Sequence, residues 1–479
     1  MSDSVLMVAE GSYPYIIGGV GTWMESLLTN LPHHNFQVAN LGSFDATPSY
    51  KIPPHVTILK SIGLSHRFQK RPWFPPRHQD SPPTAEAIEL FIQAPTPQSP
   101  SQVERVLQYA LKHTEHGYKD WVFSKPFISS LLSAAEKHPK TRLTDLSFTI
   151  REHLSYVFTL AREVKRLKNL KVIHSTTSGL AGLFSLLASM HHTTPLLLTE
   201  HADYVSEKKF YEERSMPPDK GNTVSALTTP ALTLKLNFFR NLRSALYKKC
   251  YAVTSLFEGY RTTQVKRGTQ PQKCHVIPNG IKLPTVTQVH KRNNKSHTIG
   301  YLGRLSPEKS IKTIIKTFEL FHRAYPDAKC VVAGPSTDLT YASECKELSH
   351  DLGLQGHMSF VEHTTPEDFF PNIDTLLLAS TSEGQPYAIL EAMARDVPVV
   401  CTNVGDCKRM LAFEEDGVKL NAGIAVDEHT PESLCKALFK FYKTANTTQH
   451  PGAKIIAKNF ALAQTLDGFD FLYNQSQGA

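Results

Sequence analysis

Residues 381–393, TSEGQPYAILEAM, carry two carboxylates, Glu383 in a turn and Glu391 in the helix that this turn opens. The preceding run, Thr375–Ala379, is short and apolar, as is typical of a buried strand, and Pro386 suits a helix start. Glu391 therefore projects from the helix about a turn or two beyond the loop. Because a carboxylate accepts two hydroxyl hydrogen bonds at once, both residues suit a sugar or ribose diol.

The residues that join Glu383 to the helix, Gly384, Gln385 and Pro386, would present their backbone to the same ligand. Glu391 lies in an otherwise apolar helical stretch, and burying a carboxylate without a partner is costly. The alternative is a capped helix with a salt-bridged glutamate. The segment favours a binding loop for a hydroxyl-rich ligand.

Two cations follow an earlier strand, in the sequence GYLGRLSPEK at residues 300–309. Arg304 is expected at the carboxyl end of this strand and Lys309 at the start of the next helix. Fixed cations at such a place could neutralise a diphosphate whose charge grows as it leaves. They could also be ordinary surface charges.

Working outward, short apolar runs alternate with helical ones along the whole chain, which predicts parallel sheets built from βαβ units. A polar segment, 282–296, separates two such series and predicts a linker. We therefore expect an α/β protein of two doubly wound, Rossmann-like domains, 1–281 and 297–464, with a Pro-rich insertion at about 71–100 in the first. The predicted strands are Val5–Glu10, Phe36–Leu41, Lys171–Ser175, Pro195–Glu200, Ala252–Leu256, Cys274–Ile277, Thr298–Leu302, Cys330–Ala333, Met358–Val361, Thr375–Ala379 and Pro398–Cys401.

Two features of the first series can carry chemistry. Gly18 and Gly19 precede a helical run, where the backbone could approach a phosphate or sugar, although a Gly-Gly turn is often only structural. His201 ends a strand and could position a sugar or simply satisfy a hydrogen bond. Neither a G-x-G-x-x-G nor a Walker sequence is present, so NAD-binding and P-loop functions lose support.

Composition excludes several classes of protein. Charged residues make up 20% of the chain and the net charge is +8, too modest and diffuse for nucleic-acid binding. The seven cysteines form no CxxC pair, which argues against a disulfide framework and against structural zinc. The start of the chain is not a secretory signal and no run spans a membrane, so cytoplasmic residence is expected.

Together these segments resemble the GT4 family of retaining glycosyltransferases, with a closer resemblance to the PelF-type enzymes of Pel exopolysaccharide synthesis. The resemblance implies a GT-B fold, with two Rossmann-like domains across a cleft and the tail, 465–479, packing back on the first. The segments that carry it are 10–23 (EGSYPYIIGGVGTW), 199–204 (TEHADY), 278–281 (PNGI), 300–313, 332–335 (VAGP) and 382–400 (SEGQPYAILEAMARDVPVV).

The resemblance also implies the roles of the residues. Gly18 and Gly19 would approach the donor phosphates, and Arg304 and Lys309 would hold the diphosphate. Glu383 and the backbone after it would bind the transferred sugar, Glu391 the ribose hydroxyls, and His201 would lie beside the reacting sugar. The reaction would need no cofactor and no metal, since no DxD sequence is present. The partners would be a UDP-sugar donor, a glycan acceptor and, as an open choice, an inner-membrane polysaccharide complex.

Three positions depart from the family. Asp396 stands where the family usually has Gly, and Ala202 and Ser206 stand where PelF-type sequences carry Gly and Arg. Other activities stay open: a nucleotide-sugar epimerase or hydrolase, and a degenerate scaffold that binds nucleotide. An apolar stripe at 232–246 beside basic residues fits either a core helix or a helix that lies on anionic lipid.

Overall fold

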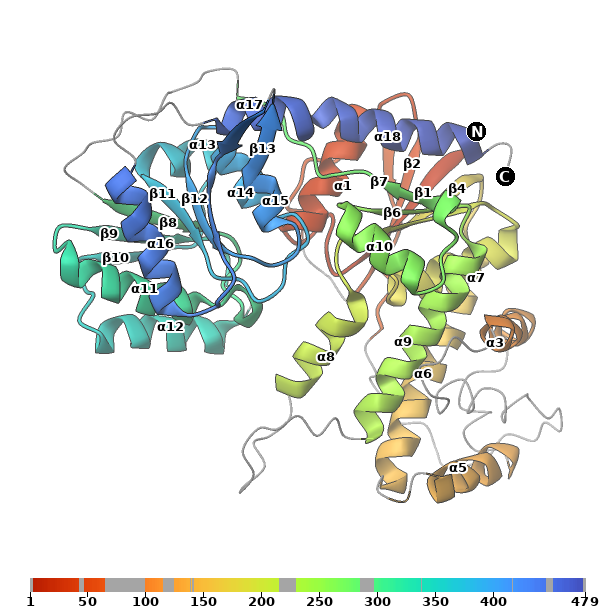
Figure 1. Cartoon of the computed structure of the whole chain (residues 1–479). Coiled ribbons are helices and arrows are strands. Elements are labelled where there is room, and N and C mark those ends of the chain that lie inside the picture. Colours follow the sequence, from red (N-terminus) through yellow and green to blue (C-terminus); the bar gives the residue numbers. More distant parts are fainter. Residues whose placement is uncertain are drawn as a thin grey trace. The chain divides into compact units, whose positions relative to one another are not determined.

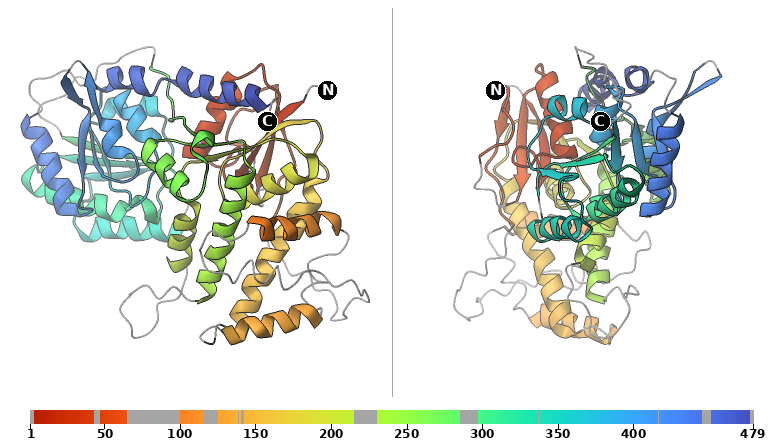
Figure 2. Two further views of the ribbon diagram at one scale, coloured as in Figure 1. Left: turned by 45° about the vertical axis from the view of Figure 1, so that its right-hand side comes forward. Right: turned by 90° about the vertical axis from the view of Figure 1, so that its left-hand side faces the viewer.

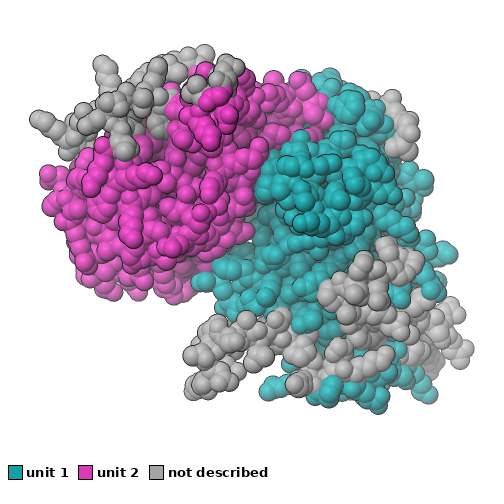
Figure 3. Space-filling view, viewed as in Figure 1, with its two compact units in different colours: residues 1–276, 469–479 teal, residues 277–468 magenta. Residues whose placement is uncertain are grey.

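The computed structural model describes residues 3–476 except for 43–46, 65–99, 115–124, 138, 140–141, 215–229, 285–296, 337, 416 and 445–450. The chain forms two compact units (Figure 3). Unit 1 comprises residues 1–276 and 469–479, and unit 2 comprises residues 277–468. The Pro-rich stretch 71–100, apart from Pro100, and most of the expected linker 282–296 lie outside the described residues.

Unit 1 is built on a sheet whose described strands are all parallel, in the order β3-β2-β1-β4-β5-β6-β7 (Figure 1). The direction of winding reverses between β1 and β4, which lie side by side with Val5 opposite Val172. The bounds are β1 Ser4–Glu10, β2 Phe36–Leu41, β3 Val56–Ile58, β4 Leu170–Ser175, β5 Leu196–Glu200, β6 Ala252–Ser255 and β7 Cys274–Val276.

Helices cover this sheet, and α6 (Leu143–Val164) and α9 (Pro230–Lys249) run alongside each other away from it (Figure 2). The apolar stripe of α9 lies in the core, with Leu232, Phe239 and Leu246 at most 2% exposed. This finding favours the core reading of the stripe over a lipid-facing one. The other helices are α1 Gly19–Asn30, α3 Pro100–Lys112, α5 Lys125–Lys137, α7 Leu180–His192, α8 Tyr204–Arg214 and α10 Glu258–Lys266.

Unit 2 repeats the plan with parallel strands in the order β10-β9-β8-β11-β12-β15, and the winding reverses between β8 and β11. Its strands are β8 Thr298–Leu302, β9 Lys329–Ala333, β10 Met358–Val361, β11 Thr375–Leu378, β12 Val399–Thr402 and β15 Gly423–Val426, with a separate hairpin, β13 Ala412–Glu415 and β14 Val418–Asn421. Its helices are α11 Ile311–Ala324, α12 Leu339–Asp351, α13 Pro366–Phe369, α14 Tyr387–Met393, α15 Cys407–Leu411, α16 Pro431–Thr444 and α17 Gly452–Asn459.

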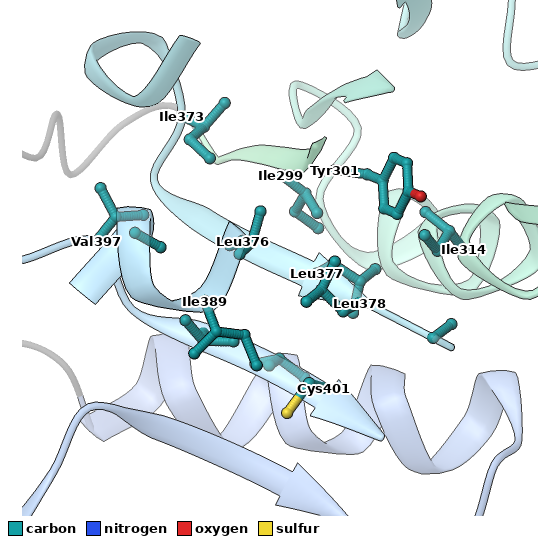
Figure 4. Packing of buried hydrophobic residues seen from close by; sticks show 14 of the residues in the cluster. Ile299, Tyr301, Ile314, Ile373, Leu376, Leu377, Leu378, Ile389, Val397 and Cys401 are labelled. Atoms are coloured by element: carbon teal, nitrogen blue, oxygen red, sulfur yellow. The ribbon is translucent and has the colours of Figure 1, made fainter. Parts of the chain in front are cut away.

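The core of unit 2 lies between the strands and their flanking helices, as Figure 4 shows for β8, β11, β12 and α14. Leu376 and Leu377 from β11 and Ile389 from α14 are fully buried. The strands read as nearly continuous apolar runs because helices cover both faces of a parallel sheet. Tyr301 is also buried, and its hydroxyl donates to the backbone carbonyl of Arg304 at 2.8 Å, which fixes the loop after β8.

One helix takes part in both units. In α18 (Leu462–Gln475), the residues up to Gly468 belong to unit 2 and those from Phe469 onward to unit 1. At its start, the Thr465 hydroxyl donates to the carbonyl of Pro278 at 2.9 Å. Towards its end, Phe469 and Tyr473 are buried in unit 1.

The predicted α/β class with two doubly wound sheets is confirmed, and each predicted strand is present to within about one residue at its ends. One local prediction was wrong. Lys309 does not start a helix: it ends a 3-10 turn, Pro307–Lys309, and Ser310 in a left-handed conformation separates that turn from α11. No described helix has the length and apolar character needed to cross a membrane.

Candidate functional site

The predicted binding residues of unit 2 follow the two strands at which the winding reverses. Arg304 lies two residues beyond the end of β8, and Glu383 lies in the loop between β11 and α14. These strands are neighbours, with Leu376 opposite Gly300. In open parallel sheets a crevice forms at the carboxyl ends of such a strand pair, and ligands bind there.

Glu383 is the centre of a small polar cluster. Its Oε1 accepts hydrogen bonds from Lys309 Nζ and from Ser380 Oγ, both at 2.7 Å. The Glu383 and Lys309 side chains are 11% and 19% exposed, so the pair is largely screened from water. The structure therefore brings together two residues that lie 74 positions apart in the sequence.

Arg304 lies in a second, looser pair at the same edge of the sheet. Its guanidinium is 3.4 Å from Glu308 Oε1, an oxygen that also accepts from Ser306 Oγ at 2.6 Å. The Arg304 side chain is 39% exposed. A cation held at this edge and still partly exposed can bond an incoming anion.

The turn 384–386 is anchored from two directions. The Gln385 amide donates to Asp406 Oδ2 at 2.6 Å and accepts the backbone N–H of Asn279 at 2.9 Å. The Asn279 side chain in turn donates to the Gln385 carbonyl at 3.0 Å. Gln385 is 4% exposed, and its side chain braces the turn from inside. Pro386 is the N-cap of α14.

Glycines allow the backbone segments of this edge to approach closely. A β-carbon on Gly405, which has φ +56°, would lie 2.1 Å from the carbonyl oxygen of Glu383. A β-carbon on Gly334 would lie 2.1 Å from the carbonyl oxygen of Gly303. A larger residue at Gly334 would push apart the loops after β8 and β9, and one at Gly405 would push apart the loops after β11 and β12.

Glu391 lies in α14 beside a buried apolar face formed by Ile389, Leu390, Ala392 and Met393. Burial raises the pKa of its carboxyl to about 7, and the positive charge of Arg395 only partly opposes this. In such surroundings the ionised carboxylate is stabilised most by a ligand that donates hydrogen bonds to it.

In unit 1, the predicted residues lie at the start of α1 and at the end of β5. Gly18 is the N-cap of α1 in an extended conformation, with no side chain capping the helix, and a β-carbon on Gly19 would meet nothing within 4 Å. Trp23, one turn further along α1, contacts the ring of His201 with centroids 4.6 Å apart. The first turns of α1 and His201 therefore lie together.

His201 has the character of a neutral hydrogen-bonding group. Burial lowers the pKa of its imidazole to about 4. Its Nε2 is buried and has no hydrogen-bond partner among the described residues. A buried imidazole nitrogen without a partner is costly, so a bound hydroxyl would stabilise it.

Glu10 is a functional candidate that sequence reasoning missed, although it ends the first strand of the chain. Its Oε2 accepts the N–H of Leu180 at the start of α7 at 2.9 Å, and its Oε1 accepts from the Tyr204 hydroxyl at 2.9 Å. Despite these bonds, burial raises its pKa. Asn279 and Asp406 were missed as well, because their contacts with Gln385 join residues far apart in the sequence. Ser380 was also missed, although it lies only three residues from Glu383.

Two protein families match the chain. The family described as "Domain of unknown function (DUF3492)" matches residues 3–272, and the family described as "Glycosyl transferases group 1" matches residues 284–456. Alpha-monoglucosyldiacylglycerol synthase from Streptococcus pneumoniae is 25% identical over 261 residues, which cover 51% of this chain and 54% of the synthase. The chain spans about half the length of the curated relatives it matches.

Solved structures share the fold over nearly the whole chain. Anabaena HepE, solved in complex with UDP and glucose, superposes with a TM-score of 0.60 at 14% identity and covers 98% of this chain and 99% of HepE. Sucrose-phosphate synthase from Thermosynechococcus elongatus gives a TM-score of 0.59 at 13% identity, over 98% of both chains. These likenesses show that the two Rossmann-like units form the GT-B fold.

Proposed function

The chain belongs to the DUF3492 family, and its residues 284–456 match the family of group 1 glycosyl transferases; on this premise we propose that it transfers a hexose from a UDP-sugar to a glycan. The observation that carries the proposal is the cluster of Lys309, Glu383 and Arg304 at the carboxyl ends of β8 and β11. It combines cations for a diphosphate with a carboxylate for sugar hydroxyls.

The donor is proposed to bind unit 2. Lys309 has three ammonium hydrogens, so its bond to Glu383 leaves two for phosphate oxygens. Arg304 adds a second, partly exposed cation. Glu391 is proposed to accept the ribose hydroxyls, which would favour its ionised form. HepE, a protein of the same fold, binds UDP, which supports a uridine nucleotide as the first to test.

The reaction is proposed to retain the configuration of the sugar. The bond between the anomeric carbon and the leaving phosphate oxygen breaks, and the acceptor oxygen bonds to that carbon on the same face. The acceptor's proton passes to an oxygen of the leaving phosphate, so no protein nucleophile is required. Arg304 and Lys309 stabilise the charge that grows on UDP. The neutral His201 is proposed to hydrogen-bond a sugar hydroxyl, and Gly18 and Gly19 to approach the donor phosphates.

The chemistry is proposed to be independent of metal, because two cationic side chains already offer the charge that a metal would supply. We expect EDTA to leave turnover unchanged. The acceptor is proposed to be an exopolysaccharide of the Pel type, on the strength of the resemblance of 10–23 and 382–400 to PelF-type enzymes.

The first experiment is calorimetric titration of the full chain with UDP, with ADP and GDP as controls. Binding of UDP alone would support the donor class, and UDP-glucose, UDP-GlcNAc and UDP-GalNAc would then be tested for transfer. A preference for ADP or GDP would indicate an ADP-sugar or a GDP-sugar as the donor instead. UDP binding without turnover would favour a scaffold, and release of free sugar without an acceptor would favour a hydrolase.

A matched pair of variants tests the role of the cation. Lys309→Ala removes the cation that contacts Glu383, whereas Lys312→Ala removes a lysine that pairs with Glu344 on the surface of unit 2. We expect a loss of turnover of at least about tenfold in the first variant, from one charge-assisted hydrogen bond of about 1.5–3 kcal/mol, and none in the second. Equal activity of the two variants would contradict the diphosphate role.

A further inference from the structure

Three side chains that could bind one metal ion meet in unit 1, far in sequence from the strand-end residues described above. His33 and His34 occupy the turn between α1 and β2, and Asp470 lies in α18. The Nε2 atoms of both imidazoles approach the same oxygen, Asp470 Oδ1, at 2.6 and 2.7 Å. One ligand atom from each residue lies within 4.8 Å of the other two.

This set of atoms has the chemistry of a zinc site. Imidazole nitrogen and carboxylate oxygen bind Zn²⁺ at about 2.0–2.2 Å, and two histidines with one carboxylate are a known three-ligand set. Small outward shifts of the three groups would place their ligand atoms at such distances around a shared ion. The cysteine pattern gives no sign of this site, because its ligands are a histidine pair and an aspartate that lies 436 residues from His34.

The cluster is held in place on one side and open on the other. His34 is 7% exposed and packs edge-on against the rings of Phe36 and Tyr473. His33 and Asp470 are 57% and 34% exposed, which leaves access for an ion and for a water as fourth ligand. Lys171 contributes a positive charge that acts on His34, and its Nζ lies 3.3 Å from Asn474 Oδ1.

We propose that His33, His34 and Asp470 form a binding site for one divalent cation of the zinc type. Two ligands come from the turn after α1 and the third from the carboxyl-terminal half of α18, so a bound ion joins the end of the chain to its first βα unit. The three residues belong to unit 1 and include none of the residues proposed to bind the donor, which are Gly18, Gly19 and His201 in unit 1 and Arg304, Lys309, Glu383 and Glu391 in unit 2.

The test uses the full chain without a histidine tag, stripped of metal and titrated with Zn²⁺ in competition with a chromophoric chelator. We expect one tight equivalent. His33→Ala and Asp470→Asn should each weaken it by at least about tenfold, because even the loss of a group that only supports a ligand costs 10–100-fold. The matched control is His350→Ala. It removes an exposed imidazole that lies 3.9 Å from the carboxylate of Asp351, in a pair that contains only one histidine.

Two further readouts separate metal binding from a structural effect of the substitutions. Bound Co²⁺ should give the intense visible absorption of a tetrahedral site in the wild type and in His350→Ala, and lose it in His33→Ala. Zn²⁺ should slow hydrogen exchange at residues 469–475 in the wild type but not in Asp470→Asn. Circular dichroism and thermal denaturation without metal check that each variant is folded. Failure to bind Zn²⁺, or equal binding by His33→Ala, would overturn the proposal.

Discussion

The proposed role of Glu391 can be tested by measuring proton release when UDP binds. Burial raises the pKa of this carboxyl from 4.5 to about 7, so the free protein holds a proton there that the unfolded chain releases. The stabilising contribution of this proton is complete below the unfolded pKa and is lost as the pH rises through about 7.

Ribose hydroxyls that donate to the carboxylate would reverse this shift. We therefore expect UDP binding to release up to one proton and to tighten as the pH rises from about 5 to 7. Titration calorimetry in two buffers of different ionisation enthalpy measures the release. Glu391→Gln should abolish it and weaken UDP binding by about tenfold or more, since a hydrogen bond to a charged group contributes about 1.5–3 kcal/mol. If proton release persists in this variant, the proton comes from a group other than Glu391.

Asp396 shows how a departure from the family pattern is accommodated. It adopts a left-handed conformation, φ 54°, in the turn after α14, and its Oδ1 accepts the N–H of Ala453 in the first turn of α17 at 2.9 Å. A glycine would remove the backbone strain but not replace this cap.

We expect Asp396→Ala to lower the free energy of unfolding by about 1–3 kcal/mol, because it keeps the strain and loses the cap. Asp396→Gly should cost less, because it loses only the cap. Urea denaturation measures both. Equal stability of the two variants would show that the left-handed conformation carries no strain.

At the scale of elements, the loops of unit 2 depend on glycines that let backbones touch. Gly405→Ala would place a β-carbon 2.1 Å from the Glu383 carbonyl at a residue with φ +56°. Gly353→Ala is the matched control, because φ is +69° there and a β-carbon would meet nothing within 4 Å.

Both alanines bear the cost of a left-handed conformation, about 1–2 kcal/mol, but only the one at 405 should displace the loop that carries Glu383. We expect UDP binding to fall by at least about tenfold in Gly405→Ala and to be unchanged in Gly353→Ala, in the same calorimetric titration. Wild-type binding by Gly405→Ala would mean that the loop tolerates the shift.

The elements also show what a sequence can and cannot predict. Strands such as Thr298–Leu302 were recognised because a strand covered on both faces is a continuous apolar run. β3 and β15 were missed: β3 is three residues long, and β15 is only partly buried and begins with a glycine. Lys309 was misplaced by two residues because a 3-10 turn and the onset of a helix have the same local signature.

In the candidate site too, features with a clear local sequence pattern could be predicted and contacts between distant residues could not. The positions of Glu383 and Arg304 after neighbouring strands could be predicted because each stands beside a strand or turn with a clear pattern. The bracing of Gln385 by Asn279 and Asp406 could not, because those contacts join residues 106 and 21 positions away. The binding roles predicted for Glu383, Arg304, Lys309, Glu391 and His201 all stay predictions until ligand binding is measured.

At the scale of the molecule, α18 contributes to the core of unit 1 from the far end of the chain. Phe469 is fully buried and packs against Trp23 and His174, whereas Phe471, two residues later, is 59% exposed. Tyr473 hydrogen-bonds His174 at 2.8 Å.

Phe469→Ala should destabilise the protein by about 3–5 kcal/mol, as expected for the loss of a buried aromatic ring. Phe471→Ala should change stability by no more than about 0.5 kcal/mol. Thermal denaturation measures the stability of both variants, which carry the same Phe-to-Ala substitution in the same helix. A similar loss in both would mean that this half of α18 does not pack as described.

The sharing of α18 also has a genetic consequence. A nonsense or frameshift mutation at a codon between those of Val426 and Phe469 would spare every described strand of both sheets, and the truncated product would be only slightly smaller on a gel. It would still delete Phe469 and Tyr473, and with them the buried rings that contact Trp23 and His174 in the core of unit 1. Such late alleles should therefore behave as loss-of-function alleles, with phenotypes close to those of missense changes at Trp23 or His174.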